Sequence, residues 1–168
     1  LVATATVTVT GTAGDPHLDT VKIGELLATL SPDSADDAFT VVEVPLAEGA
    51  NEIRATARDT LGHQAVSEPV LYVRDSTPPR ITIASPVEGE IVSGQEIVVS
   101  GSASDPHLLS VAVNGVAATL DEVAGTYTVT VPLLVGPNTL TAIATDRAGH
   151  TTQAVVTVVP RPLDSQPP

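Results

Sequence analysis

An internal repeat constrains this chain more than any other feature. Residues 11–18 read GTAGDPHL and residues 101–108 read GSASDPHL, 90 positions later in a chain of 168 residues. The match continues as far as Gly62-His63, which returns as Gly149-His150 after 87 positions. A period of this length indicates two copies of one folded unit rather than a single domain. We expect the three additional residues of the first copy to lie in its acidic stretch, residues 31–38.

A pair of adjacent prolines marks the boundary between the copies. They lie in residues 75–79, and because proline rings restrict the backbone we expect a short linker there. The first repeat is then residues 1–74 and the second is residues 80–160. A Pro-rich tail, or the start of the next linker, is expected at residues 161–168.

The two copies differ at their beginning. The second opens with a predicted strand over residues 80–84, which the first lacks because Leu1 aligns with Ile91. The chain also begins without an initiator Met or a signal-peptide pattern. We therefore expect a piece of a longer protein, whose first strand is either removed or supplied by another chain.

Alternation of residue types predicts strands throughout. Residues 4–12 alternate Thr with Ala or Val, as a half-buried strand does. Asn114-Gly115 and Gly24-Glu25 are expected in two-residue hairpin turns of types I′ and II′. About seven short strands in each copy are typical of an immunoglobulin-like sandwich. The predicted fold is all-β: two tandem immunoglobulin-like antiparallel β-sandwiches, the first lacking its opening strand. The residues expected to be buried are Ile53, Ala55, Ala57, Leu140, Ala142 and Ala144.

Several short motifs of the second copy carry a family resemblance. They are Thr77-Pro78-Pro79, Ile81-x-Ile83-x-Ser85-Pro86, Val98-x-Ser100-Gly101, Val113-Asn114-Gly115, Pro132-Leu133, Gly136-x-Asn138 and Asp146-x-Ala148-Gly149. With them the chain resembles the bacterial immunoglobulin-like repeats of adhesins and other exported proteins, especially the glucodextranase domain B-like group. The resemblance implies an extracellular or cell-surface location and a role as spacer or binding module. The chain departs from the pattern at His63 and His150, where such repeats usually have Asn.

Charge and composition exclude several classes of partner. The formal net charge of −13 repels phosphate backbones and anionic headgroups, so we expect no nucleic acid binding and no membrane binding. No apolar run approaches the roughly 18 residues that a membrane-spanning helix needs. The chain has no Cys, which excludes disulfides, zinc–thiolate sites and thiol catalysis. Aromatic residues make up 2% of the chain, too few for an easy stacking platform for sugars.

The four histidines fall at matched positions of the repeat, in Asp-Pro-His loops and in Asp-x-x-Gly-His hairpins. In an immunoglobulin-like sandwich these loops lie at one end, so their side chains should converge. One interpretation is turn chemistry, in which Asp accepts backbone N–H bonds; Asn51 and Asn138 are expected to bond the backbone too. The other is a metal site, where an acidic surface suits Ca²⁺ better than zinc. The metal prediction names Asp75, Asp105 and Asp146, with Asp15 and Asp59 as weaker candidates.

Catalytic motifs are not found in the sequence. It has no Gly-x-Ser-x-Gly elbow, no glycine-rich phosphate loop and no His-Glu-x-x-His. Asp33, Asp36 and Asp37 could pair as acid and base, but a loop of variable length is better interpreted as solvated. We therefore expect no enzyme activity, no catalytic residues, and no cofactor other than the Ca²⁺ considered above.

Three functions are compatible with these observations. The leading one is a non-catalytic extracellular spacer, stalk or adhesion segment of a larger bacterial surface or secreted protein. Its partners would be neighbouring immunoglobulin-like domains of the same chain, and the sequence identifies no protein or glycan receptor. The second is an accessory domain pair of a secreted glycan-processing enzyme or toxin. The third is a filament subunit that uses strand donation, for which the Pro-rich tail is a poor donor because proline cannot extend a ladder.

Overall fold

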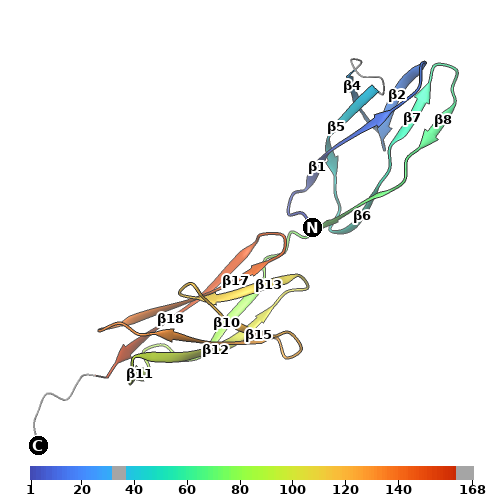
Figure 1. Cartoon of the computed structure of the whole chain (residues 1–168). Helices are drawn as coiled ribbons and strands as arrows, with labels where there is room; N and C mark the ends of the chain where they lie inside the picture. Colours follow the sequence, from blue (N-terminus) through green and yellow to red (C-terminus); the bar gives the residue numbers. More distant parts are fainter. Residues whose placement is uncertain (32–36, 162–168) are drawn as a thin grey trace, which may run out of the picture. The chain divides into compact units, whose positions relative to one another are not determined.

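The computed structural model describes residues 1–31 and 37–161. The chain divides into two compact units, Leu1–Ser76 and Thr77–Pro168, and each is described by itself. All regular structure in the described residues is β-strand (Figure 1). The predicted tail from residue 162 onward lies outside the described residues, as do Asp33, Asp36 and the side chain of Asp37.

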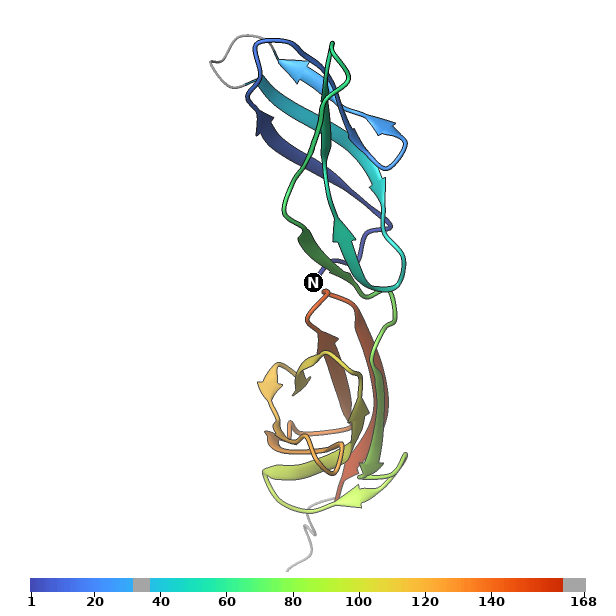
Figure 2. The same ribbon diagram turned by 90° about the vertical axis from the view of Figure 1, so that its right-hand side faces the viewer.

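The second unit is a sandwich of two sheets (Figure 2). Its strands are β10 (Arg80–Ser85), β11 (Ile91–Val92), β12 (Glu96–Ser104), β13 (Leu108–Val113), β14 (Val116–Ala117), β15 (Thr119–Asp121), β16 (Thr126–Pro132), β17 (Asn138–Asp146) and β18 (Thr151–Pro160). One sheet has the order β10-β12-β16-β15 and the other β11-β18-β17-β13-β14. Neighbouring strands are antiparallel, except that the short β11 runs parallel to β18.

The core of the second unit follows the alternation of its strands. In β16, Tyr127, Val129 and Val131 are buried, while the threonines between them are exposed. Removing these side chains from water is the main term that stabilises the sandwich. The facing β17 contributes Leu140, Ala142 and Ala144, which are buried as predicted, each at 0% exposure.

Glycine at position 101 lets β10 lie close to β12. A Cβ atom at Gly101 would overlap the backbone carbonyl of Thr82 and come within 2.9 Å of the Tyr127 ring. The Tyr127 hydroxyl donates a hydrogen bond of 3.0 Å to that same carbonyl. From β10, Ile81 and Ile83 pack against the core. The opening strand is therefore an integral part of the second unit.

The first unit has a related topology without a counterpart of β10, and the counterparts of β17 and β18 are each divided into two shorter strands. Its strands are β1 (Thr6–Ala13), β2 (Leu18–Ile23), β3 (Leu26–Leu27), β4 (Thr29–Ser31), β5 (Asp37–Pro45), β6 (Gly49–Ile53), β7 (Thr56–Asp59), β8 (Gln64–Val66) and β9 (Val70–Arg74). One sheet has the order β1-β5-β4; the opposite layer consists of β3-β2-β7-β8 and the pair β6-β9. The ladder breaks between β8 and β9, where Pro69 has no N–H to donate and Ser67 Oγ instead accepts a 3.0 Å hydrogen bond from the Ala55 N–H.

The predicted absence of an opening strand in the first unit is confirmed. Val2 forms a parallel bridge with Arg74, as β11 does with β18, so the described chain enters the first unit at the position of β11. The predicted burial of Ile53, Ala55 and Ala57 is wrong in degree, because all three are only half-buried. Their counterparts in β17 are covered by β10, which the first unit does not have.

The three additional residues expected in the acidic stretch of the first copy have two origins. Ser31 pairs with Ala38 and Asp121 pairs with Thr126, so only two of the three additional residues lie in the predicted acidic stretch. The third lies in β5, where the pairing shifts between Val7 and Val9 and Glu43 has a φ of 56°. This is a β-bulge, which a pattern of residue types does not reveal.

The predicted turns and the asparagine bonds are confirmed. Asn114 and Gly115 both have positive φ, 48° and 83°, as a type I′ turn requires, whereas in the turn at Gly24 only the glycine does, with a φ of 56°. Asn138 Oδ1 accepts the Leu134 N–H at 2.7 Å, and Asn51 accepts the Ala47 N–H at 2.8 Å. These side chains brace the loops before β17 and β6.

Candidate functional site

In each unit, the Asp-Pro-His turn meets the Asp-x-x-Gly-His hairpin. In the second unit Leu108 pairs with Asp146, and the Arg147 N–H donates a 2.9 Å hydrogen bond to the His107 carbonyl. In the first unit Leu18 pairs with Asp59, and the corresponding hydrogen bond, from Thr60 to His17, is 3.0 Å. The sequence prediction that these two loops lie at one end of the sandwich is confirmed.

The Asp146 carboxylate organises the hairpin of the second unit. Its Oδ1 accepts the backbone N–H groups of Ala148 and His150, each at 2.8 Å, and its Oδ2 accepts a 2.8 Å hydrogen bond from Nδ1 of the His150 ring. The φ of Gly149 is 97°, a conformation that glycine adopts without strain. Asp146 therefore has a structural role as the cap of its own turn.

The first unit repeats this arrangement with different exposure. Asp59 Oδ1 accepts the N–H groups of Leu61 and His63 at 2.9 and 2.8 Å, and Oδ2 lies 2.7 Å from the His63 ring. The His63 side chain is 80% exposed, whereas that of His150 is 25% exposed. Solvent screens the first pair more, so the same geometry stabilises the first unit less.

Hydrogen bonding lowers the pKa of both hairpin carboxylates. Burial of Asp146 by itself raises its pKa, but hydrogen bonds from the His150 ring and from the backbone of the hairpin outweigh it, so the pKa lies below its ordinary value. The pKa of Asp59 is lowered against the same opposing burial by hydrogen bonds from His63. Both groups are thus held as carboxylates at neutral pH.

The Asp-Pro-His turns are capped in the same way. Asp105 Oδ1 accepts the His107 N–H at 2.7 Å, and Asp15 Oδ1 accepts the His17 N–H at 2.7 Å. The interpretation of these aspartates as turn residues is confirmed by their hydrogen bonds.

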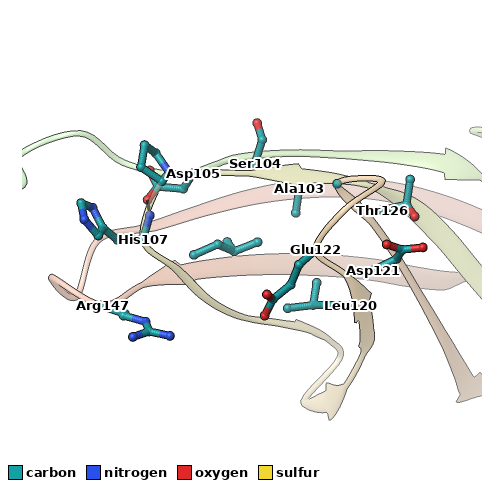
Figure 3. A pocket seen from close by; sticks show the side chains of 12 residues that line it. Ala103, Ser104, Asp105, His107, Leu120, Asp121, Glu122, Thr126 and Arg147 are labelled. Carbon is teal, nitrogen blue, oxygen red and sulfur yellow. Dashed lines mark hydrogen bonds between the residues drawn. The ribbon is translucent and has the colours of Figure 1, made fainter.

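A cavity of about 460 Å³ adjoins the Asp105 turn of the second unit. Figure 3 shows Asp105 and His107 at one end and Asp121 and Thr126 at the other, with Leu120 and Glu122 between them. Of its carboxylates, Asp121 caps the hairpin between β15 and β16, since its Oδ1 accepts the N–H groups two and three residues later at 3.1 and 3.0 Å. Arg147 also lines the cavity.

Sequence reasoning missed this cavity. Its walls come from β12, β15, β16 and the β17–β18 hairpin, which only the pairing of strands brings together. A local signal existed for Asp121, which directly precedes a hairpin loop rich in small residues. The sequence also missed Glu48, whose carboxylate accepts hydrogen bonds from the Ser76 hydroxyl at 2.7 Å and the Ser76 N–H at 3.1 Å. These bonds lower the pKa of Glu48.

The residues of the calcium prediction come from both units. Asp75 follows β9 in the first unit, and its N–H donates a 2.9 Å hydrogen bond to the Val2 carbonyl. Asp105 and Asp146 belong to the second unit, and the weaker candidates Asp15 and Asp59 to the first. Every oxygen of Asp146 already accepts a hydrogen bond within its hairpin, so a cation there would compete with the turn. Calcium binding stays a prediction.

Comparison with known proteins agrees with this geometry. Residues 79–161, nearly the whole second unit, match the family described as glucodextranase, domain B. The second unit is a bacterial immunoglobulin-like domain. The first unit shares its repeated sequence and its strand pairing, without the opening strand.

A sequence relative and a solved structure extend the match over both units. The chain is 34% identical over 146 residues to Bacillopeptidase F of Bacillus subtilis (strain 168). The aligned residues make up 87% of this chain but only 10% of that protein. Fibronectin(III)-like modules of Clostridium thermocellum CbhA are similar with a TM-score of 0.55 and 16% identity, covering 94% of this chain and 87% of theirs. The likeness to the CbhA modules supports the fold alone. Together, the family match and the two relatives indicate an accessory immunoglobulin-like module.

Within residues 1–31 and 37–161, no helix is long and apolar enough to cross a membrane.

Proposed function

We propose that this chain is a non-catalytic extracellular spacer segment of a larger secreted or cell-surface protein. Duplication is the observation that carries the proposal. Asp59 and His63 lie 2.7 Å apart, and their counterparts Asp146 and His150 lie 2.8 Å apart in the same kind of hairpin. A turn that stabilises a fold is repeated with the fold, whereas a catalytic centre requires one preorganised set of groups.

The hydrogen bonds inside these turns support the same conclusion. Each hairpin aspartate has one oxygen bonded to the backbone and the other to the histidine that follows it. A histidine acting as general base needs a nucleophile within hydrogen-bond reach and a separate group that orients it. In the hairpins, the groups that could do this work stabilise loops instead.

A longer secreted enzyme is the setting that we favour over an adhesin. The relative at 34% identity is named Bacillopeptidase F, and the matching family model is named for glucodextranase, so both names are those of enzymes. Since the chain spans one tenth of that relative, most of such a protein lies in other domains. In this setting, the two units would separate or position domains that carry the activity.

Two measurements on the isolated chain test the proposal. Hydrolysis assays with glucans, casein and ester substrates should give no turnover; turnover that His107→Ala or His150→Ala abolishes would contradict it. For spacing, fluorophores attached at residues 1 and 161 should give a narrower distribution of energy transfer than a Gly/Ser linker of equal length. An equally broad distribution in the folded chain would refute a spacer role.

A further inference from the structure

The first unit contains an apolar cavity of about 440 Å³ between its two layers. Its walls include Val9 and Phe39 from one sheet and Ile53, Ala57 and Val70 from the other layer. Several of the lining side chains are half-exposed or exposed, Val66 at 61% and Val70 at 52%. Aliphatic side chains left in water at the edge of a core lose the stabilisation that burial provides.

In the second unit a strand occupies the equivalent place. β10 pairs with β12, with Ile83 opposite Gly101 and Ile81 opposite Ala103. It also contacts β17 and β18 across the sandwich, and both isoleucines pack against the core. The residues that hold β10 have counterparts around the cavity of the first unit. These counterparts are Gly11 and Ala13 for Gly101 and Ala103, and Ala55 and Ala57 for Ala142 and Ala144.

The backbone next to this cavity has an open edge. β1 ends its sheet in the order β1-β5-β4, whereas its counterpart β12 is flanked by β10 and β16. An edge strand presents unpaired N–H and C=O groups on which another strand can pair. Gly11 leaves this edge without a side chain, although the nearby Phe39 ring, 2.7 Å from the position of a Cβ atom, would by itself favour glycine there.

We infer that β1 and the apolar cavity form an acceptor site for one further β-strand. The occupant is an extended segment that runs antiparallel to β1 and places aliphatic side chains opposite Gly11 and Ala13. It resembles Arg80–Ser85 in pattern and is joined to the N-terminal side of Leu1 in the same polypeptide. With it in place, the first unit becomes a complete sandwich like the second.

Two observations favour a donor in the same polypeptide over a second copy of this chain. In the second unit only residues 86–90 separate β10 from β11, and Val2, the counterpart of Val92 in β11, is already bridged to Arg74. A segment joined to Leu1 with the same spacing therefore reaches the edge of β1. The β10 strand of a second copy is already paired with its own β12, so it would have to leave its own domain first.

A grafted chain tests this inference. A copy of residues 77–90 is fused ahead of Leu1, which reproduces the spacing of the second unit. Hydrogen exchange of the backbone amides of β1 is then compared between the grafted and the original chain. We expect at least about tenfold slower exchange in β1 and slower exchange in β7, with unchanged rates in the second unit. The matched control replaces the grafted copies of Ile81 and Ile83 with Asn.

Gly11→Ala provides the second arm. At Gly101 an added methyl group would overlap the carbonyl of the paired strand, so the same methyl at position 11 should prevent the graft from docking. In the grafted chain, Gly11→Ala should return β1 exchange to its original rate. Unchanged exchange on grafting, or equal protection by the Asn control, would overturn the inference. Protection of β1 that rises with concentration in the original chain, together with dimers in sedimentation, would identify a second copy as the occupant and would also overturn it.

Discussion

The carboxylate of Asp146 holds His150 twice, accepting its backbone N–H at Oδ1 and its ring Nδ1–H at Oδ2, both at 2.8 Å. The Asp146 side chain is 0% exposed, so these bonds form away from solvent. Asp146→Ala should therefore destabilise the second unit by at least about 2 kcal/mol, because two backbone N–H groups lose their acceptor. Urea unfolding followed by hydrogen exchange in each unit measures this. Asp59→Ala is the matched variant, and an equal or larger effect there would contradict the role of burial.

Acid should weaken both hairpins. The folded-state pKa values of Asp59 and Asp146 lie below the unfolded value of about 4, so their stabilisation is present above that pH and is lost as the pH falls through the folded pKa. The free energy of unfolding, measured between pH 7 and pH 2, should fall less steeply in the variant Asp59→Asn/Asp146→Asn. If the free energy of unfolding falls equally steeply with pH in the variant and in the natural chain, these carboxylates do not cause the loss of stability in acid.

Alanine at the two matched glycines should have unequal effects. Gly101→Ala forces a methyl group into the Thr82 carbonyl of β10, which is backbone and cannot move away without opening the sheet. Gly11→Ala meets only the Phe39 ring, which can tilt. We expect Gly101→Ala to lower the free energy of unfolding by about 1–3 kcal/mol more than Gly11→Ala does. Thermal unfolding of the two variants decides, and a smaller loss for Gly101→Ala would be evidence against close packing of β10.

Enlarging a β17 alanine and its counterpart should separate a full core from an incomplete one. Ala142 is 0% exposed, so Ala142→Leu overpacks the second unit and should cost about 1–3 kcal/mol. Ala55 lines the apolar cavity of the first unit, so Ala55→Leu has room and should cost less or even stabilise. Chemical denaturation measures both, and equal losses would mean that the cavity is not available to a side chain.

The sequence predicts a calcium site at Asp75, Asp105 and Asp146, because oxygen ligands suit Ca²⁺. Calorimetric titration at millimolar Ca²⁺ should give heat that Asp105→Asn removes, with scattering reporting any change in interdomain flexibility. Since Asp146 already caps its hairpin, Asp75→Asn is the cleaner second variant. Titration without heat would leave these aspartates with their structural roles alone.

Prediction from sequence succeeded where the information is local or periodic. The alternation of Tyr127, Val129 and Val131 with threonines is enough to define a strand with one buried face. The Asn114-Gly115 pair defines its turn because few residues accept positive φ. The Asp-Pro-His turns could also be predicted, because their information is local: each Asp accepts a hydrogen bond from a backbone N–H only two residues away.

Other features depend on contacts between distant segments. Residue type does not distinguish Ala55 from Ala142, yet one is half-buried and the other is 0% exposed. The bulge at Glu43 likewise follows from pairing with β1 rather than from the residues of β5 alone. Both differences arise because the burial and the strand pairing of a residue depend on the segments that surround it as well as on its own type.

The repeat, the strands, the turns and the immunoglobulin-like class could be predicted before folding was considered, because each follows from spacing along the chain. The folded structure was needed to show that the Asp146 carboxylate is fully engaged in its own hairpin and that β1 has an open edge beside an apolar cavity. Hydrogen-bond satisfaction and packing are properties of groups that folding brings together, so they could be read only once the strands were in place.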